Sequence, residues 1–389
     1  MRKLVSFLVG AVISVGPIYI AIAQQGAPGS PLAGITSRQL ELFRLGREDF
    51  LEVERAEDGL GPSFNGTSCA QCHNIPAVGG TGTMVEMRAG QSEGGRFYAP
   101  AGGTLHHLFS IPPHDCQVSV YPESNVIAHR ISIPLFGAGL VEEVPDDLIL
   151  ALQDPEDRNG DGIRGRAAIV EDLATGKQRV GRFGWKAQHA TLLAFAADAY
   201  VNEMGITNDL FRAEVSADGD PVKLRRCDPT PDPEDQRDPR TGLRGIDNFA
   251  NFLRFLAPLS RGAITGEVLR GEKIFQEIGC AACHIPQLVT GPNSNPVFHL
   301  KQVNLFSDLL LHDIGTGDGI DQEAAKGDEI RTPALWGLRF RRPLLHDGSA
   351  STIQQVIQRH QAEASSSSKL FSALTNEEKE SLLAFLNSL

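Results

Sequence analysis

Two short motifs combine a pair of thiols with an imidazole at fixed spacing. Each reads Cys-x-x-Cys-His, at residues 69–73 and 280–284. In such a motif the thiols can form thioether bonds to the vinyl groups of a haem, and the adjacent imidazole reaches the iron from one side. The sequence therefore predicts two covalent haems of the c type, with His73 and His284 as proximal iron ligands. The residues that attach them are Cys69, Cys72 and His73 for the first haem, and Cys280, Cys283 and His284 for the second.

A zinc site or a thioredoxin-like dithiol would also use paired cysteines. Two copies of the full motif, together with an export signal at residues 1–23, favour haem over both. The signal has a basic start, an apolar stretch and the small-x-small site Ala21-Ile22-Ala23. A membrane anchor is the alternative, but the apolar stretch is short and is interrupted by Gly16-Pro17. We expect a bacterial protein that is periplasmic or otherwise exported, with no membrane span after cleavage.

The ligand on the side of each iron opposite the motif histidine determines whether that haem can react with another molecule. His360 follows Ile353, Val356 and Ile357 at helical spacing, on the apolar face of an expected helix. A histidine in that place is often a core residue, but this part of the chain must also cover a haem. We therefore predict that His360 is the second ligand of the haem at His284. Two imidazoles would give a closed, relatively low-potential iron, whereas a His/Met pair would raise the potential.

The second ligand of the first haem is left open by the sequence. Met84, Met87, His106 and His107 follow its motif and carry atoms that can bind iron. An open iron position is the alternative. Reaction with peroxide or oxygen requires an open position, and a closed iron would only transfer electrons.

Residues 157–162 read Asp-x-Asn-x-Asp-Gly, like the first half of an EF-hand loop. Asp157, Asn159 and Asp161 would supply oxygen ligands to Ca²⁺. Position 12 of such a loop would be Ala168 instead of the usual glutamate, although Glu171 or Asp172 could substitute. A polar turn without a metal is the alternative.

Cys116 and Cys227 remain outside the two motifs. In an oxidising compartment they are expected to form a disulfide, with two free thiols as the alternative. Removing the two basic residues of the signal from the 36 in the chain leaves 34 against 48 acidic residues, a net charge of −14. That charge argues against nucleic acid as a partner and would suit a basic redox partner such as a small cytochrome or a cupredoxin.

A degenerate repeat precedes the motifs. Residues 46–50 (Gly-Arg-Glu-Asp-Phe) and 271–275 (Gly-Glu-Lys-Ile-Phe) start with Gly and end with Phe. The repeat predicts a mainly α protein with two cytochrome c-like haem domains, at residues 36–261 and 262–389. The first domain must carry a long, loop-rich insertion because residues 74–260 are too many for one cytochrome module. A capping box at Thr375–Glu378 predicts the final helix.

Five segments resemble known di-haem proteins. Residues 331–338 (Arg-Thr-Pro-Ala-Leu-Trp-Gly-Leu) and 343–348 (Pro-Leu-Leu-His-Asp-Gly) resemble the signature of bacterial di-haem cytochrome c peroxidases and of methylamine-dehydrogenase maturation enzymes. Residues 133–142, 161–166 and 181–187 resemble the narrower di-haem oxidoreductase family, whose members are often labelled "thiol oxidoreductase-like" and described as peroxidases. The thiol label does not suit this sequence, because thioether bonds to haem would use the thiols of these cysteines.

The resemblance implies two mainly helical haem domains around a cleft. It implies that the N-terminal haem meets the oxidant, that the C-terminal haem relays electrons, and that Ca²⁺ binds near the interface. His360 lies where relatives carry a Met or Tyr ligand. A peroxidase also needs an acid–base group over the open iron, for which Glu142 and Glu143 are candidates, with surface carboxylates as the alternative. Trp185 could carry electrons between the haems, or it could be a core residue.

Three functions follow as expectations. The favoured one is a peroxidase-like enzyme that reduces peroxide or oxygen at the N-terminal haem. The second is a non-catalytic electron carrier with two closed irons. The third is an oxidase or oxygenase that acts on an organic small molecule. The long insertion favours an enzyme, because a carrier rarely needs so much chain around one haem.

Overall fold

The computed structural model describes residues 27–112, 114, 116–117, 120–215, 219–228 and 236–389. The export signal predicted at residues 1–23 lies outside the described residues. Within the described ranges, no helix combines the length and the apolar character needed to cross a bilayer.

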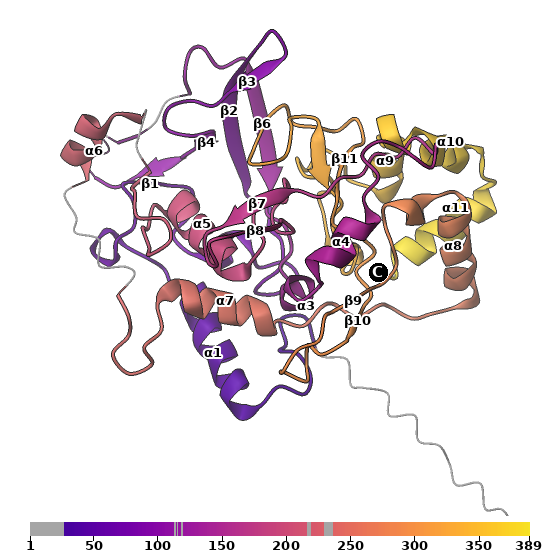
Figure 1. The fold of residues 1–389 in the computed structure, drawn as a ribbon, viewed down its shortest axis with the longest axis horizontal. Helices are drawn as coiled ribbons and strands as arrows, with labels where there is room; N and C mark the ends of the chain where they lie inside the picture. Colours follow the sequence, from indigo (N-terminus) through magenta and orange to yellow (C-terminus); the bar gives the residue numbers. More distant parts are fainter. Residues whose placement is uncertain (1–26, 113, 115, 118–119, 216–218, 229–235) are drawn as a thin grey trace, which may run out of the picture.

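A helix precedes each Cys-x-x-Cys-His motif, and a later helix crosses it. Helix α1 (Ser37–Leu51) packs against α7 (Gly245–Phe255), and α8 (Gly266–Glu277) packs against α11 (Asn376–Leu386). Figure 1 shows the first pair on the opposite side of the molecule from the second. Both pairs approach closely at the glycine of the repeat. A Cβ at Gly46 would overlap the backbone oxygen of Asn248, and one at Gly271 would overlap that of Ser381.

The phenylalanine that ends each repeat packs in the same way in both pairs. The ring of Phe50 lies 4.9 Å from that of Phe252 and 6.2 Å from that of His73. The ring of Phe275 lies 5.2 Å from that of Phe385 and 6.4 Å from that of His284. The weak sequence repeat thus corresponds to a repeated packing arrangement around each motif.

Short helices and strands connect these pairs. The other α-helices are α2 (Cys69–Cys72), α3 (Ala138–Glu142), α4 (Asp146–Leu152), α5 (Leu192–Met204), α6 (Pro221–Cys227), α9 (Ile353–Gln358) and α10 (Ser365–Ala373). Thr375 and Glu378 form the predicted capping box at the start of α11. Helix α9 ends at Gln358, so His360 lies just beyond it instead of on its expected apolar face.

The insertion contains a sheet that the sequence did not predict. Strand β2 (Val85–Glu93) pairs antiparallel with β3 (Arg96–Tyr98), β4 (Leu105–His106) and β6 (Val126–Ile131). The register places Met87 opposite both His106 and His129. Two-stranded antiparallel pairs make up the other sheets: β1 (Ser63–Phe64) with β5 (Phe109–Ser110), β7 (Ile169–Asp172) with β8 (Lys177–Val180), β9 (Leu288–Val289) with β10 (Gln302–Val303), and β11 (Leu311–Asp313) with β12 (Glu329–Arg331).

Two large hydrophobic cores hold the molecule together. The first combines side chains of α1, α5 and α7, and the second combines those of α8, α9, α10 and α11. Leu288, Phe298 and Leu305 follow the second motif in the chain but are buried in the first core. The two predicted haem domains therefore pack directly against each other.

Cys116 and Cys227 form a disulfide between buried positions 111 residues apart. We expect replacement of both by Ser to lower the free energy of unfolding by about 2–4 kcal/mol, because the bond restricts a long loop of the unfolded chain. Denaturant unfolding of the double variant and the parent, followed by far-UV circular dichroism, measures this. Equal unfolding midpoints would contradict the prediction.

Candidate functional site

The first motif borders a cavity with about 1300 Å³ of space, part of it open to solvent. Side chains from α1, α2, α5, α7, β2 and β6 line it, and they include Cys69, Cys72 and His73. Among the described residues that line this cavity, His73 is the only histidine.

The second motif borders a separate cavity of similar size, also about 1300 Å³. Side chains from α8, α9, α10 and α11 line it together with Cys280, Cys283 and His284. His360, which the sequence predicts as the second ligand, lines the same cavity.

Three histidines at these cavities are oriented in the same way. Nδ1 of His73 lies 2.9 Å from the backbone oxygen of Gly80, and Nδ1 of His284 lies 3.0 Å from that of Phe306. Nδ1 of His360 lies 2.7 Å from the backbone oxygen of Val356. Because a carbonyl oxygen only accepts, each Nδ1 donates and each Nε2 keeps a free lone pair. Histidines that bind metals are oriented in this manner.

The electrostatics keep these imidazoles neutral. Burial lowers the pKa of His73 and of His360. Burial and the neighbouring His360 lower the pKa of His284 to about 4. A neutral imidazole is the form that binds a metal.

The four motif cysteines do not suit the alternative sites. They form no disulfide, and burial raises the pKa of Cys69, Cys72 and Cys280 to about 12. A reactive dithiol needs the opposite shift. Within the part of the chain that the structure describes, neither motif brings its two cysteines into a cluster of metal-binding side chains, so neither forms the closed site of a structural zinc.

Buried arginines face both cavities. At the first, Arg130 is 2 % exposed; its Nε and Nη1 bind Asp318 and Gln322, but its Nη2 has no partner. At the second, the described residues place no carboxylate within ion-pair distance of Arg331 or Arg341, and burial lowers the pKa of each to about 10. Such cations match a ligand that carries carboxylates, as the propionates of a haem do. The residues present therefore fit one haem in each cavity.

Trp185 lies between the cavities and contributes to the wall of both. Its Nε1 donates to the backbone oxygen of Ile131 at 2.8 Å, and its ring meets that of His346 edge-on at 6.2 Å. The Arg341 guanidinium lies 6.0 Å from the indole centroid. Trp185 is thus a side chain that the linings of the two cavities share.

Glu142 and Glu143 have other partners and line neither cavity. Glu142 accepts from the backbone N–H of Leu192 at the start of α5 and pairs with Arg254 at 3.1 Å. Glu143 accepts from Asn293 at 2.7 Å. Their predicted acid–base role does not fit these positions, because the chain turns both carboxylates towards structural contacts.

The carboxyl groups at the first cavity are those of Glu86, Asp198 and Glu203, which the sequence did not single out. Glu86 on β2 and Glu203 at the end of α5 share a hydrogen bond. Glu86 also pairs with Arg88 at 2.7 Å, and Glu203 accepts from Asn65 at 3.1 Å. No motif connects strand β2 to helix α5, so only the folded structure brings this pair together.

The two members of this pair differ in acidity. Burial, and then the charge of Glu86, raise the pKa of Glu203 well above its usual value. Burial would also raise the pKa of Glu86, but Arg88 and Arg130 lower it overall. These opposite shifts favour a proton on Glu203 and a negative charge on Glu86.

Of the four candidates for the second ligand of the first haem, only Met84 lines the cavity. Its Sδ lies 3.6 Å from Sγ of Cys72, on the side of the attachment cysteines. His107 is buried elsewhere, with Nε2 at 2.7 Å from the backbone oxygen of Asn202. Met87 and His106 are paired strand residues that do not line the cavity.

The Asp157 loop forms a polar turn at the surface. Asp157 Oδ1 accepts from the N–H of Gly162, and Asn159 Oδ1 accepts from the N–H of Asp161, each at 3.0 Å. Asn159 Nδ2 donates to Asp161 at 2.9 Å. These contacts occupy several of the oxygens that would bind Ca²⁺.

A curated relative, the cytochrome-c peroxidase IdrP2 of Denitromonas iodatirespirans, is 27 % identical over 186 residues, which is 40 % of this chain and 50 % of the relative. The chain thus spans about half the length of the curated relative that it matches.

Two solved structures show similarity over most of the chain. One is hydrazine synthase of Kuenenia stuttgartiensis, at 17 % identity and a TM-score of 0.42, with 99 % of this chain and 100 % of that chain covered. The other is the dihaem peroxidase BthA of Burkholderia thailandensis, at 14 % identity and a TM-score of 0.42, with 90 % and 86 % covered. Residues 110–389 match the family described as "Di-haem oxidoreductase, putative peroxidase". Because this match covers well over half of the sequence, the chain belongs to the di-haem oxidoreductase family.

Proposed function

We propose that this protein is an exported di-haem enzyme of the c type that reduces a peroxide at its first haem, with electrons that arrive through its second haem. One observation carries the proposal. The cavity at His284 holds a second imidazole, His360, whereas the cavity at His73 holds no second histidine among its described lining residues and instead holds the Glu86–Glu203 pair. The second iron would be closed and suited to electron transfer, and the first would be open and suited to reaction.

The haem at His73 would bind the peroxide and supply the electrons that break its O–O bond. The overall reaction consumes one H₂O₂, two electrons and two protons and yields two H₂O, with the electrons drawn from an external one-electron donor. Glu86, as the ionised member of the pair, can accept a proton from one peroxide oxygen. Glu203, as the protonated member, can donate one to the other oxygen as it leaves as water. The pair then still holds one proton.

Spectroscopy of the holo protein tests the assignment of both irons. A pyridine haemochrome assay and intact mass should give two covalent haems per chain. Electron paramagnetic resonance should give one low-spin bis-imidazole iron and one high-spin or weakly bound iron that changes on addition of peroxide. Two low-spin irons that do not respond to peroxide would instead identify an electron carrier.

An organic substrate is the second candidate, because the first cavity has an apolar mouth. Val85 and Leu108 line that cavity and are 40 % and 42 % exposed. Turnover of an alkyl hydroperoxide or another organic substrate faster than H₂O₂, at equal donor concentration, would favour this candidate.

We propose Trp185 as the electron path between the haems, because it borders both cavities. We expect Trp185→Phe to slow oxidation of the second haem after peroxide is added to the reduced protein, while both haem spectra stay unchanged. Stopped-flow absorbance at the wavelengths of the two haems measures this rate. A rate equal to that of the parent would exclude the indole from the path.

Calcium binding at the Asp157 loop stays a prediction. Isothermal titration of Ca²⁺ into metal-free protein should show one site, and Asp161→Asn should weaken it by removing a charged ligand. Absence of binding in the parent protein would leave the loop as a polar turn.

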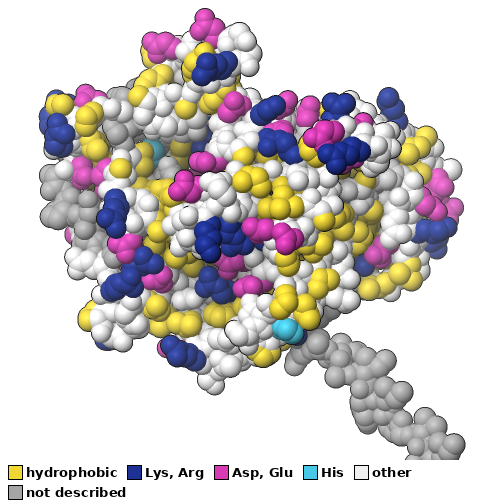
Figure 2. Space-filling model, in the orientation of Figure 1, with side chains coloured by type: hydrophobic (Ala, Val, Ile, Leu, Met, Phe, Trp, Pro, Cys, Tyr) yellow, Lys and Arg dark blue, Asp and Glu magenta, His cyan; other side chains and the backbone are white. Residues whose placement is uncertain are grey.

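The electron donor is expected to be a small basic cytochrome or cupredoxin, on account of the net charge of −14. On the face shown in Figure 2, however, acidic and basic side chains are interspersed and are not segregated. The rate of reduction by candidate donors should fall as ionic strength rises if charge guides their docking.

A further inference from the structure

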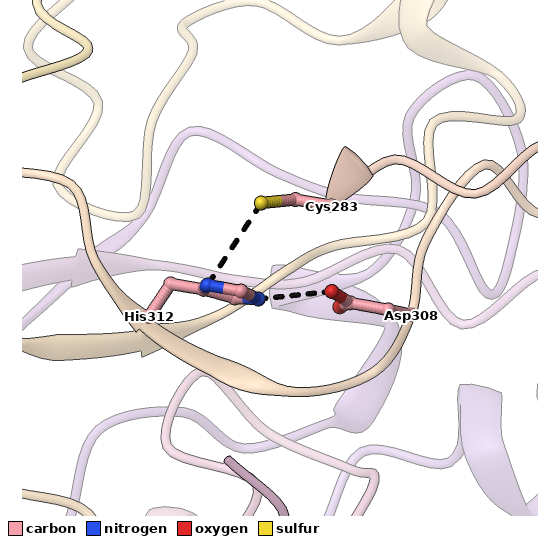
Figure 3. A group of neighbouring side chains, drawn as sticks. All are labelled: Cys283, Asp308 and His312. Atoms are coloured by element: carbon pink, nitrogen blue, oxygen red, sulfur yellow. Dashed lines mark hydrogen bonds and ion pairs between the residues drawn. The ribbon is translucent and has the colours of Figure 1, made fainter. Parts of the chain in front are cut away.

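His312 on β11 is a buried histidine that has no role in haem attachment or in the proposed proton transfer. Its Nε2 lies 2.9 Å from Asp308 Oδ2, and its Nδ1 lies 2.8 Å from Glu363 Oε2 and 3.8 Å from Cys283 Sγ. Figure 3 shows the ring between Cys283 and Asp308. His312 is 3 % exposed, and the side chains of Asp308 and Glu363 are 2 % and 13 % exposed.

These side chains resemble a metal site but do not suit one. A metal would need a free ring nitrogen, and both nitrogens of His312 already face carboxylates. It would also need the thiol of Cys283, which the haem motif uses.

The arrangement requires His312 to be an imidazolium. A neutral imidazole has one N–H, and two carboxylate acceptors at its two nitrogens require two. Burial alone would lower the pKa of His312, but the hydrogen bonds to Asp308, Cys283 and Glu363 raise it well above its usual value. The ring is therefore a fixed positive charge between two negative ones.

This ring touches the chain segments that carry both iron ligands of the second haem. Cys283 immediately precedes the proximal ligand His284, and Glu363 lies three residues beyond His360. The Glu363 carboxylate also accepts from the backbone N–H of Asp313 at 3.0 Å and of Arg164 at 2.8 Å.

A second contact ties the same segments together. The N–H of Gln361 donates to the backbone oxygen of Ile314 at 2.9 Å, so β11 and the residues after His360 are joined by both main chain and side chains. The His360 side chain is itself held by a hydrogen bond from its Nδ1 to the backbone oxygen of Val356. The Glu363 contacts therefore account for much of what holds the chain beyond α9 in place.

We propose that His312 is a positioning residue: through Glu363 it fixes the segment that carries His360 at the distance from His284 that keeps the second iron closed. This inference rests on the proposed ligation of that haem by His284 and His360. The charge on His312 matters because a hydrogen bond between two charged groups is stronger than one between neutral groups.

The test is carbon monoxide binding to the reduced holo protein, because CO binds the second haem only when His360 has left it. In Glu363→Ala, we expect the ratio of open to closed second haem to rise about 10- to 100-fold, the effect of losing one charged hydrogen bond. The low-spin signal of that haem should weaken and should return when free imidazole is added. His312→Gln should act in the same direction and serves if Glu363→Ala cannot be obtained with both haems.

Glu272→Gln is the matched control. It removes one carboxylate charge from the same part of the chain, where Glu272 pairs with Arg261 at 3.1 Å, away from both ligand segments. It should leave CO binding at the second haem unchanged. Thermal unfolding of all three variants separates a local opening from a general loss of stability.

The outcomes distinguish this inference from the function on which it rests. If the parent protein shows no bis-imidazole iron, the proposed ligation itself is wrong. If the parent shows it, and Glu363→Ala and His312→Gln both keep the second haem closed to CO, then His312 does not position His360.

Discussion

Replacing Glu203 by Gln should lower kcat/KM for peroxide by about 10²- to 10⁴-fold, the usual contribution of one acid–base group. The amide keeps the shape of the side chain and its contact with Asn65 but cannot donate the proton that the leaving oxygen needs. The haem content and the high-spin signal of the first haem should stay as in the parent. Steady-state turnover with H₂O₂ and a fixed electron donor measures the loss.

Glu143→Gln provides the comparison, because Glu143 was a candidate from sequence but contacts Asn293 and lines neither cavity. It should change kcat/KM by less than about twofold. A large loss in Glu143→Gln with little effect in Glu203→Gln would reverse the assignment of the acid–base group.

The pH dependence of turnover gives a second check on the pair. The raised pKa of Glu203 means that it keeps its proton to a higher pH than an ordinary glutamate and loses it as the pH rises through that pKa, so kcat/KM should fall on the alkaline side. In Glu203→Gln this alkaline fall should disappear. The charged groups that act on the pair are Arg88 and Arg130, and Asp198 in turn raises the pKa of Arg88.

Replacing His360 by Ala should convert the second haem from low spin to high spin and open it to CO. His360 is the buried imidazole at this cavity to which we assign the second ligand position, and Ala cannot bind iron. His360→Met should keep the iron closed but raise its potential, by on the order of 0.1 V within the ~0.8 V range that axial ligands cover. Magnetic resonance and spectroelectrochemistry measure these changes.

His346→Gln is the control for ligand identity, because His346 is buried at the same cavity. It should retain the low-spin signal and the potential of the second haem within a small shift. Loss of that signal in His346→Gln, with retention in His360→Ala, would make His346 the ligand.

Local sequence patterns identified the features that depend only on residues close together in the chain. The Cys-x-x-Cys-His spacing is short enough to be read directly, and the capping box at Thr375 and Glu378 is present as predicted. The match of residues 110–389 confirms the family that the motifs indicated. The Gly and Phe residues of the two repeats could be aligned in the sequence. Only the packing shows that each Gly allows two helices to approach closely and that each Phe lies beside a motif histidine.

The long insertion resisted prediction because its structure depends on contacts between distant segments. Strand β2 pairs with three strands that lie later in the chain, and its apolar and charged residues alternate only over residues 85–89. Glu142 ends a family-like segment and Glu143 follows it, which made both of them candidates, but the fold turns them towards α5 and Asn293.

The sequence alone therefore determined the family, and its local spacing supplied the hypotheses of haem attachment at both motifs and of the His284–His360 ligand pair. Only the tertiary structure decided which groups surround each iron. Glu86 meets Glu203 and Trp185 borders both cavities because strands, helices and loops from distant parts of the chain converge there. The physical reason is that a proton shared between two carboxyl groups, or an imidazolium between two carboxylates, depends on distances of about 3 Å across the folded molecule. Residues far apart in the sequence reach such distances only after folding, so no local or periodic sequence pattern encodes them.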